Sequence, residues 1–325
     1  MNTPPVTIGL PVHNGANYLG DAIRCLREQT FGDFRMIVSD NASTDATEEI
    51  ARSAASEDRR ILYYRHAVNL GAPANYNYTL DAAESQFFMW HAHDDLRDSR
   101  FLELAHATLA SSSEVSVTFS RAESIGPSGE RLGAVPRPDG LVHAAPHQRL
   151  RAVVESKRPE LVLFGLMRRQ LLERTRKHGR FKGADRILVA EMGLLGGFQE
   201  IDEVLFYNRE HPDRYTAMGV GPAAEQRRRE WWDPDRTGGV RMPRWKGLWG
   251  YLGAIGRHPL PPSERVMCYV ALIQSLFDNR MRFSKQLSGE LMGLVPNALS
   301  WLSRDSRAHS TGRTIGSDES DRFEP

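Results

Sequence analysis

The first 125 residues alternate between short apolar runs and amphipathic stretches, and this alternation restricts the possible folds more than any other feature. Within the amphipathic stretch 19–29, Leu19, Ile23 and Leu26 fall on one helical face. The apolar, β-branched runs lie at 6–12, 34–40, 60–66, 86–93 and 115–124. Strands alternating with helices at this spacing predict parallel βαβ units, with helices on both faces of one sheet.

The pattern loosens after residue 125, and this change suggests a domain organisation. We expect a main domain over 1–215, with halves 1–125 and 126–215, then a helical extension over 216–305 and a disordered tail over 306–325. The expected elements beyond residue 125 are a long loop at 126–146, helices at 147–177 and 184–196, a strand at 201–210 and interrupted helices at 222–303.

Composition excludes several classes of protein. The 42 Lys and Arg nearly balance the 41 Asp and Glu, so no overall field favours nucleic acid. The two cysteines, Cys25 and Cys268, are far apart in sequence and fit a reduced compartment. The first residues lack a basic region and their apolar run is short, so we expect no signal peptide, and no run of eighteen apolar residues is present. We therefore expect a cytoplasmic protein, with contact to the inner face of the membrane left open.

Polar residues follow the predicted strands, where ligands of open parallel sheets bind. The strand ends carry Pro11-Val12-His13-Asn14, Asp40-Asn41, Arg65 with Asn69 nearby, and Asp94-Asp95. Asp40 alone is equally well explained as a turn residue. Adjacent carboxylates repel each other, however, so Asp94 and Asp95 favour a cation held between them and a ligand.

Three blocks in this order resemble a known family: "IGLPVHNGANYLGD" with its continuation through "SDNASTD", then "NLGAPANYNYTL", then "WHAHDDL". Together they are similar to the nucleotide-sugar-binding half of inverting family 2 glycosyltransferases with the GT-A fold. The resemblance covers residues 6–125 and continues more weakly over 164–211. It implies a Rossmann-like, mostly parallel sheet and a metal-dependent, inverting transfer of sugar from a nucleoside-diphosphate sugar. The acceptor would be a hydroxyl of a glycan, a glycolipid or a natural product, as in polysaccharide biosynthesis.

The resemblance also implies roles for individual residues. The donor nucleotide would be bound by Pro11, Val12, Asn14, Asp40, Asn41, Arg65, Asn69 and Asp94. The metal, Mn²⁺ or Mg²⁺, would be bound by Asp95 and Asp94, with His93 and His211 as further candidates. The catalytic base would be Asp185, with Glu191 as the alternative; the simpler explanation of Asp185 is a helix cap.

One position departs from the family pattern. The family usually has an acidic residue two positions before the first aspartate of the pair, and here that residue is Ala92, flanked by His91 and His93. If the strand continues that far, His91, His93 and Asp95 share one face, and His93 could then reach the cation. For His91 we expect simple packing instead. Whether the histidines replace the missing carboxylate stays open.

Two other functions compete with glycosyl transfer. A non-catalytic nucleotide-sugar-binding protein would explain Ala92, but the retained aspartates argue against it. A nucleotidyltransferase would need a Gly-rich, basic turn after the first strand, which is not present. The aromatic residues Trp231, Trp232, Trp245 and Trp249 are expected to pack a helical appendage, with an acceptor platform or a membrane-facing belt as alternatives.

Overall fold

The computed structural model describes residues 3–137, 140–217, 219, 224, 226, 231–232 and 243–278. Met1–Gly239 and Pro243–Ser275 belong to one compact unit, distinct from a second unit of Val240–Met242 and Leu276–Pro325. The predicted tail over 306–325 lies outside the described residues, as do parts of the predicted helical stretch 222–303.

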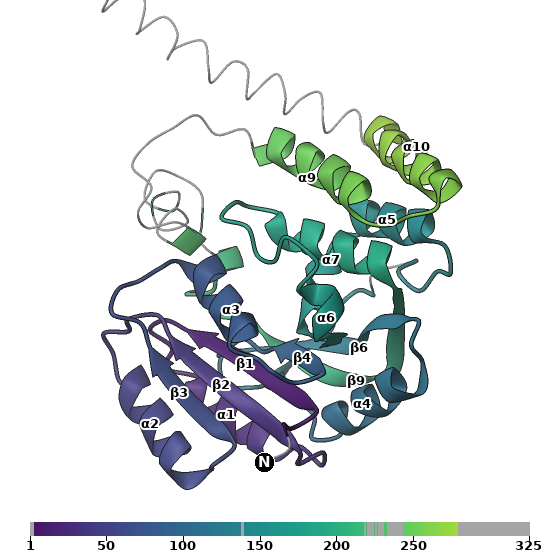
Figure 1. The fold of residues 1–325 in the computed structure, drawn as a ribbon. Coiled ribbons are helices and arrows are strands. Elements are labelled where there is room, and N and C mark those ends of the chain that lie inside the picture. The colour runs from purple at the N-terminus through teal and green to yellow at the C-terminus, as the bar shows by residue number, and fades with distance from the viewer. Residues whose placement is uncertain are drawn as a thin grey trace, which may run out of the picture. The chain divides into compact units, whose positions relative to one another are not determined.

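Four parallel strands form the first half of the sheet (Figure 1). They are β1 (Val6–Val12), β2 (Phe34–Asp40), β3 (Ile61–Arg65) and β4 (Phe87–Trp90). The register pairs Val12 with Asp40 and Asp40 with Arg65, so these strands end together. The prediction of parallel βαβ units is confirmed for this half.

The second half of the sheet has mixed directions. Its strands are β5 (Leu96–Arg97), β6 (Val115–Ile125), β7 (Arg131–Ala134), β8 (Leu166–Arg168) and β9 (Gly197–Arg209). The strand order is β3-β2-β1-β4-β8-β6-β9-β5, with β7 paired to β6. β8 runs antiparallel to both β4 and β6, whereas β6 and β9 are parallel.

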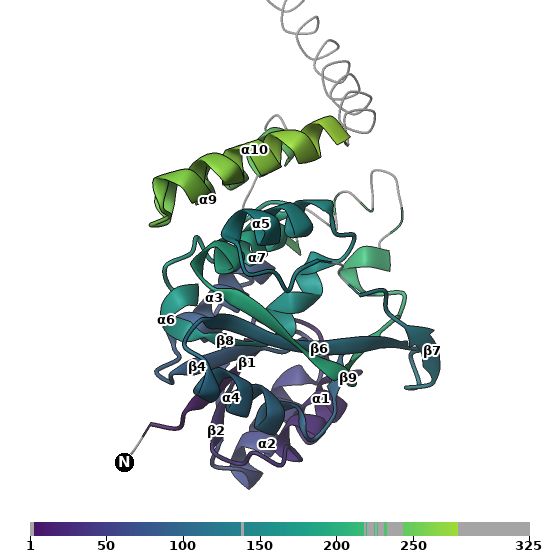
Figure 2. The same cartoon turned by 90° about the vertical axis from the view of Figure 1, so that its right-hand side faces the viewer.

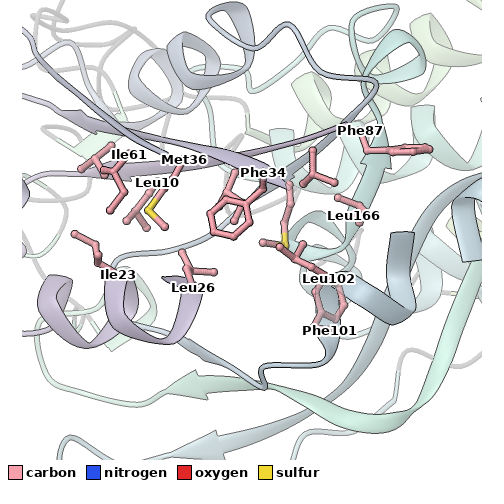
Figure 3. Packing of buried hydrophobic residues seen from close by; sticks show 14 of the residues in the cluster. Leu10, Ile23, Leu26, Phe34, Met36, Ile61, Phe87, Phe101, Leu102 and Leu166 are labelled. Atoms are coloured by element: carbon pink, nitrogen blue, oxygen red, sulfur yellow. The ribbon is translucent and has the colours of Figure 1, made fainter. Parts of the chain in front are cut away.

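Helices cover both faces of the sheet, as predicted (Figures 1 and 2). One face carries α1 (Leu19–Arg27), α2 (Thr47–Glu57) and α4 (Phe101–Ser111), and the other carries α3 (Ala72–Asp81), α6 (Arg169–Leu172) and α7 (Ala184–Leu195). Alternate residues of β1, including Ile8 and Leu10, pack with Ile23 and Leu26 of α1 (Figure 3). Fully burying each such side chain contributes about 1.5–3 kcal/mol.

The expected helix over 147–177 is wrong. This segment contains α5 (Pro146–Glu155), a 3₁₀ helix (Pro159–Phe164), β8 and α6. Pro159 cannot continue a helix, because it has no backbone N–H and its ring clashes with the preceding turn. Leu166 and Met167 then fill the sheet between β4 and β6, where both are fully buried. The expected helix over 184–196 is confirmed by α7.

Two further helices follow the sheet domain: α9 (Pro243–Arg257) and α10 (Pro262–Asp278). α9 packs on α7, where Gly250 allows close approach: a Cβ atom there would lie 2.2 Å from Cδ1 of Ile187. Within the described part of the chain, no helix is long and apolar enough to cross a membrane.

Candidate active site

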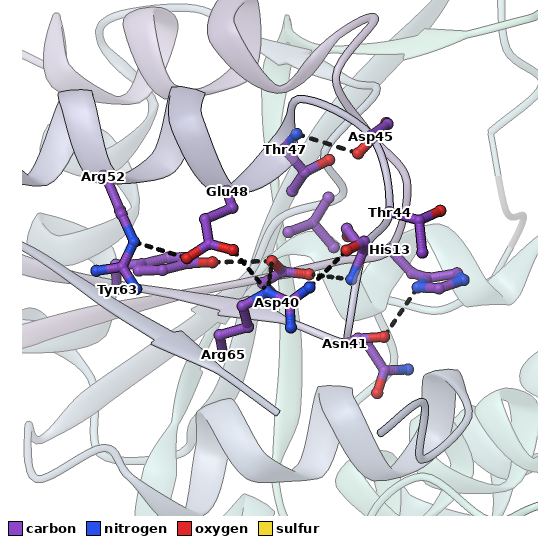
Figure 4. Close-up of polar contacts among 12 residues, drawn as sticks. His13, Asp40, Asn41, Thr44, Asp45, Thr47, Glu48, Arg52, Tyr63 and Arg65 are labelled. Carbon is purple, nitrogen blue, oxygen red and sulfur yellow. Dashed lines mark hydrogen bonds and ion pairs between the residues drawn. The ribbon is translucent and has the colours of Figure 1, made fainter. Parts of the chain in front are cut away.

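Asp40, at the end of β2, is fully buried and already holds several partners (Figure 4). Its Oδ1 accepts a hydrogen bond from the Ser43 N–H at 2.8 Å, and its Oδ2 accepts one from the Tyr63 hydroxyl at 2.8 Å. Burial, followed by the hydrogen bond to Asp40, raises the pKa of Tyr63. Asp40 therefore lies buried at the strand end, and it fixes the loop that follows β2.

Arg65, at the end of β3, provides the compensating charge. Its Nε lies 3.4 Å from Asp40 Oδ2 and 2.9 Å from Glu48 Oε2, and its Nη2 donates to the Ser43 carbonyl at 2.7 Å. One third of the Arg65 side chain remains exposed. The guanidinium therefore bridges β2, β3 and α2 and still reaches solvent at the carboxyl edge of the sheet.

Polar side chains after β1, β2 and β3 form one hydrogen-bonded group at this edge. His13 Nδ1 donates to the Asn41 carbonyl at 2.9 Å, because a carbonyl can only accept. Asn41 Nδ2 donates to Asn69 Oδ1 at 2.8 Å, and Asn14 Oδ1 accepts from the Thr44 N–H at 2.8 Å. These bonds fix the orientation of the amides, so the structure brings the predicted donor-binding residues Asn14, Asn41 and Asn69 together.

The acidic turn after β4 differs from the expectation in one respect. β4 ends at Trp90, and β5 begins only at Leu96. The strand does not continue to residue 95, so the condition under which His91, His93 and Asp95 would share one face is not met. A turn over 93–94 separates these side chains, because the chain must bend there to pair Leu96 with Tyr207 of β9.

Asp94 lies in this turn and contacts His211, just beyond β9. His211 Nε2 donates to Asp94 Oδ2 at 2.9 Å, and 17% of the Asp94 side chain is exposed. Burial by itself would raise the pKa of Asp94, but the neighbouring His93 and the bond from His211 outweigh it and hold the pKa well below its usual range. Asp94 is therefore the ionised carboxylate of the pair.

Asp95 points into the protein. It is 3% exposed, and its Oδ1 accepts hydrogen bonds from Asn208 Nδ2 at 3.0 Å and from the Arg209 N–H at 2.8 Å. Burial, and then the charge of Asp94, raises its pKa. Asp95 thus fastens the acidic turn to β9, and Asp94 is the more accessible carboxylate.

The two histidines of the turn have different surroundings. His91 is fully buried, as expected for a packed ring; its Nδ1 donates to the Ala92 carbonyl at 2.7 Å. Burial, and then the charge of Arg97, lowers the pKa of His91 to about 3. The ring of His93 lies against Gly15: a Cβ atom on Gly15 would lie 2.4 Å from His93 Cδ2. Gly15 and His93 thus join the acidic turn to the loop after β1.

The sequence analysis missed Arg209, which organises the turn from β9. Its side chain is 2% exposed, and its Nε donates to the Asp94 carbonyl at 2.7 Å. Its Nη1 donates to the Pro127 carbonyl at 2.8 Å, and its guanidinium lies 4.6 Å from the Tyr18 ring centroid. No local sequence signal identified Arg209, because its partners in the turn and in the loop after β6 lie far away in the sequence.

Asp185 and Glu191 both lie on α7, in different environments. Asp185 is in the first turn, after Gly183, whose φ of 89° favours glycine. It is partly buried, and burial raises its pKa. Glu191 is fully buried; its Oε2 accepts from the Arg176 N–H at 2.8 Å, and its Oε1 pairs with Arg257. Glu191 therefore holds α7 to α9, which leaves Asp185 as the base candidate.

Asp94 and His211 are the residues that fit a divalent cation. Asp94 offers a carboxylate oxygen, and His211 would offer Nε2 once a bound cation had displaced the proton that this nitrogen donates to Asp94; such a donor pair suits Mn²⁺. No group of three potential metal-binding side chains occurs among the described residues. A cation here would therefore need donor phosphate oxygens to complete its coordination, as is common for Mg²⁺ sites.

The tryptophans differ in their packing. Trp231 and Trp232 pack with Tyr215 and each other: the Tyr215–Trp231 ring centroids are 4.7 Å apart, and Trp232 Nε1 donates to the Tyr215 hydroxyl at 2.8 Å. The expectation of packing is wrong for Trp249, which is 65% exposed because it lies on the outer side of α9. The side chain of Trp245 lies outside the described residues.

Comparisons with known proteins agree with this geometry. Residues 7–154 match the family described as glycosyl transferase family 2. An uncharacterized glycosyltransferase of Rickettsia typhi is 37% identical over 94 residues, which are 29% of this chain and 28% of that protein. A putative glycosyltransferase of Bacillus subtilis, EpsH, is 30% identical over 103 residues, or 32% and 30% of the two chains. This chain spans less than a third of the length of either relative.

Solved structures share the fold. S. aureus TarS, residues 1–349 with UDP, has a TM-score of 0.53 at 17% identity, covering 87% of this chain and 91% of that one. The mannosyltransferase PcManGT from Pyrobaculum calidifontis, with GDP-Man and Mn²⁺, has a TM-score of 0.51 at 18% identity, covering 93% and 84%. At these identities the similarity establishes the fold, which is of the GT-A type, as the sequence predicted.

Proposed function

Because residues 7–154 carry a glycosyl transferase family 2 domain, we propose that this protein transfers a sugar from a nucleoside-diphosphate sugar to a hydroxyl group of an acceptor. The transfer is metal-dependent and inverts the anomeric centre. The acceptor class is a glycan, a glycolipid or a natural product, and the reaction belongs to polysaccharide or related glycan synthesis in the cytoplasm.

One observation carries this proposal: the Asp94–His211 pair lies beside the edge that holds the donor-binding candidates. Gly15 contacts His93, so the acidic turn adjoins the loop that carries Asn14. A nucleotide bound over Asp40 and Asn41 would therefore extend its diphosphate toward Asp94. Solved structures of similar fold contain UDP, UDP-GlcNAc or GDP-Man, which supports this class of donor.

Asp94 and His211 would hold the cation in this proposal. When bound, the cation offsets the negative charge that develops on the diphosphate leaving group. Asp95 and Arg209 keep Asp94 in place, because they bind the turn from its buried side. Because Asp94 is already held in place, little rearrangement is needed when the cation binds. The cation would therefore hold the donor diphosphate in a fixed position.

Asp185 is the proposed base. In an inverting transfer, a carboxylate removes the proton from the acceptor hydroxyl while that oxygen attacks the anomeric carbon from the face opposite the leaving group. Burial raises the pKa of Asp185 and so makes its carboxylate a stronger base. Asp185 lies in the first turn of α7, which follows the proposed donor-binding half in the sequence.

The experiment is a screen of UDP- and GDP-sugars for release of nucleoside diphosphate, with and without Mn²⁺, in the presence of a mixed pool of hydroxyl acceptors. We expect metal-stimulated release with at least one donor and its loss in Asp94→Asn. Asp81→Asn is a matched control, because Asp81, at the end of α3, is an exposed aspartate that pairs with Lys177. If donors bind but no nucleoside diphosphate is released from any of them, the protein is a binding module and the proposal fails.

A further inference from the structure

The loop between α6 and α7 is anchored to α3 at His178. The His178 N–H donates to Asn77 Oδ1 at 2.9 Å, and the His178 carbonyl accepts from Asn77 Nδ2 at 2.9 Å. Next to it in the loop, Lys177 pairs with Asp81 at the end of α3. Asn77 and His178 are 101 positions apart in the sequence. One side chain of the first half of the domain therefore satisfies both backbone groups of a residue in the second half.

The ring of His178 lies between two aromatic side chains. Its centroid is 4.9 Å from that of Tyr76 on α3 and 4.7 Å from that of Trp90, at interplanar angles of 60° and 70°. Trp90 is fully buried, and its Nε1 donates to the Tyr76 carbonyl at 3.0 Å, so the two neighbours of the ring are fixed to each other. Trp90 is the last residue of β4, and the acidic turn with Asp94 follows it. His178 thus packs against the end of the strand that leads into the proposed cation site.

Packing, rather than charge or hydrogen bonding, holds this ring in place. Burial lowers the pKa of His178 to about 4, so the imidazole is neutral at neutral pH. Its Nε2 is buried and has no hydrogen-bond partner among the described residues. The ring therefore acts here as a flat aromatic group, and a phenyl ring could provide the same packing.

The chain between His178 and α7 is compact. The Phe181 N–H donates to the Gly179 carbonyl at 2.9 Å, and the Ala184 N–H donates to the Phe181 carbonyl at 3.2 Å. A Cβ atom at Gly179 would lie 2.7 Å from Cε1 of Phe181, so this turn is closely packed. Asp185, the proposed base, is the next residue, in the first turn of α7. Two successive tight turns therefore connect the anchored histidine to the proposed base.

The loop needs an anchor on α3 because its own charges repel each other. Residues 174–182 contain five lysines and arginines and no acidic residue. Repulsion of this kind favours an extended chain. The Arg176 N–H donates to Glu191 Oε2 at 2.8 Å, which ties the start of the loop to α7 itself. The contacts of His178 are different, because they tie the loop to α3 and β4 and so to the half of the domain that carries the acidic turn.

We infer that His178 is a positioning residue for the proposed transfer: by packing between Tyr76 and Trp90, it sets the position of Asp185 relative to the acidic turn. The inference rests on the proposed function, because it takes Asp185 as the base. The acceptor oxygen attacks productively only while base and donor are held in the correct geometry, and a displacement of about 1 Å can lower the rate by about a hundredfold. His178 therefore acts on turnover through Asp185 and leaves the donor-binding candidates at the strand ends in place.

The test compares kcat and nucleotide binding of the full-length protein and its variants, with the UDP- or GDP-sugar that the release screen identifies. His178→Ala should lower kcat by about tenfold or more, while Mn²⁺-dependent affinity for UDP or GDP changes by less than about twofold. His178→Phe should restore kcat to within about threefold of the parent, because a phenyl ring fills the same space. Asn77→Ala, which removes both bonds to the His178 backbone, should lower kcat in the same way and serves as the test if His178→Ala does not fold.

The matched control is His106→Ala. The ring of His106 also packs between two aromatic rings, with centroids 4.5 Å from Phe31 and 5.4 Å from Phe87. It belongs to α4, on the opposite face of the sheet from α3 and α7 (Figure 1). Removing it should lower the free energy of unfolding and leave kcat unchanged, because no contact of His106 leads to the acidic turn or to Asp185.

A double-variant comparison separates positioning from a general loss of structure. In the Asp185→Asn protein, His178→Ala should cause little further loss of turnover, because both changes affect the same proton transfer. Equal fractional losses in the parent and in Asp185→Asn would overturn the inference. So would a loss of kcat in His106→Ala as large as in His178→Ala, or a His178→Phe variant as slow as His178→Ala.

Failure of this inference is distinct from failure of the proposed function. If Asp185→Asn is inactive and His178→Ala has normal kcat, the inference alone is wrong. If Asp185→Asn turns over normally, Asp185 is not the base, and the inference falls with that role while glycosyl transfer stands. If the parent releases no nucleoside diphosphate from any donor, the proposed function itself is refuted, and the inference with it.

Discussion

Gly15→Ala tests whether the loop after β1 and the acidic turn are packed against each other. A Cβ atom at Gly15 would lie 2.4 Å from His93 Cδ2 and 2.5 Å from Val12 Cγ2, well inside van der Waals contact. The backbone at Gly15 is not in the left-handed region, so the effect of alanine is steric alone. Overpacking of this kind costs about 1–3 kcal/mol, and part of the displacement should pass to Asp94 through His93.

The assay is urea unfolding, combined with Mn²⁺-dependent binding of UDP or GDP. We expect a lower free energy of unfolding and weaker metal-stimulated binding. Gly20→Ala is the matched control: a Cβ atom at Gly20, in α1, meets nothing within 4 Å. It should stabilise the protein by about 0.5–1 kcal/mol, because alanine favours helix more than glycine does. If Gly15→Ala is as stable as the parent and binds nucleotide equally well, the two loops are not in contact as described.

Two further predictions concern charge and catalysis. Asp185→Asn should leave the affinity for the donor unchanged while turnover falls by at least about a hundredfold; normal turnover in a steady-state assay would exclude Asp185 as the base. The folded-state pKa of His91 is about 3, below the unfolded value, so the unfolded chain takes up a proton first as the pH falls. The contribution of neutral, buried His91 to the free energy of unfolding is therefore fully present above the unfolded pKa of about 6.5. It decreases by about 2 kcal/mol when the pH falls from 7 to 5. His91→Gln should flatten that part of a plot of unfolding free energy against pH, and an unchanged slope would show that other groups cause it.

The donor half of the fold could be read from the sequence because its signals are local. Strand and helix periodicities succeed one another at short spacing, and the polar residues that end each strand follow directly from them. Asn14, Asp40, Asn41 and Asn69 were therefore predicted near one another, and the structure places them in contact or close to it. The prediction needed only the rule that parallel strands end at the same edge.

The other half was less predictable because long-range contacts determine it. β8 has only three residues, and its apolar sequence fits a helix equally well until β4 and β6 provide its partners. The burial of Asp95 depends on Asn208 and Arg209, more than a hundred residues later. No local pattern showed that the second aspartate would face inward, or that a buried arginine would hold the backbone of the first.

The bonds from Arg209 and His211 to the acidic turn affect how the chain acquires its activity during synthesis. Asp94 meets His211 across 117 positions of sequence and Arg209 across 115. The first four parallel strands can pair while the later half is still within the ribosome. At that stage the acidic turn has not yet met the imidazole of His211 or the guanidinium of Arg209. A nascent chain that has released only the first half would therefore contain the proposed donor-binding residues without the complete Asp94–His211 pair. The proposed transferase activity should therefore appear late in synthesis and abruptly, once β9 has inserted beside β6.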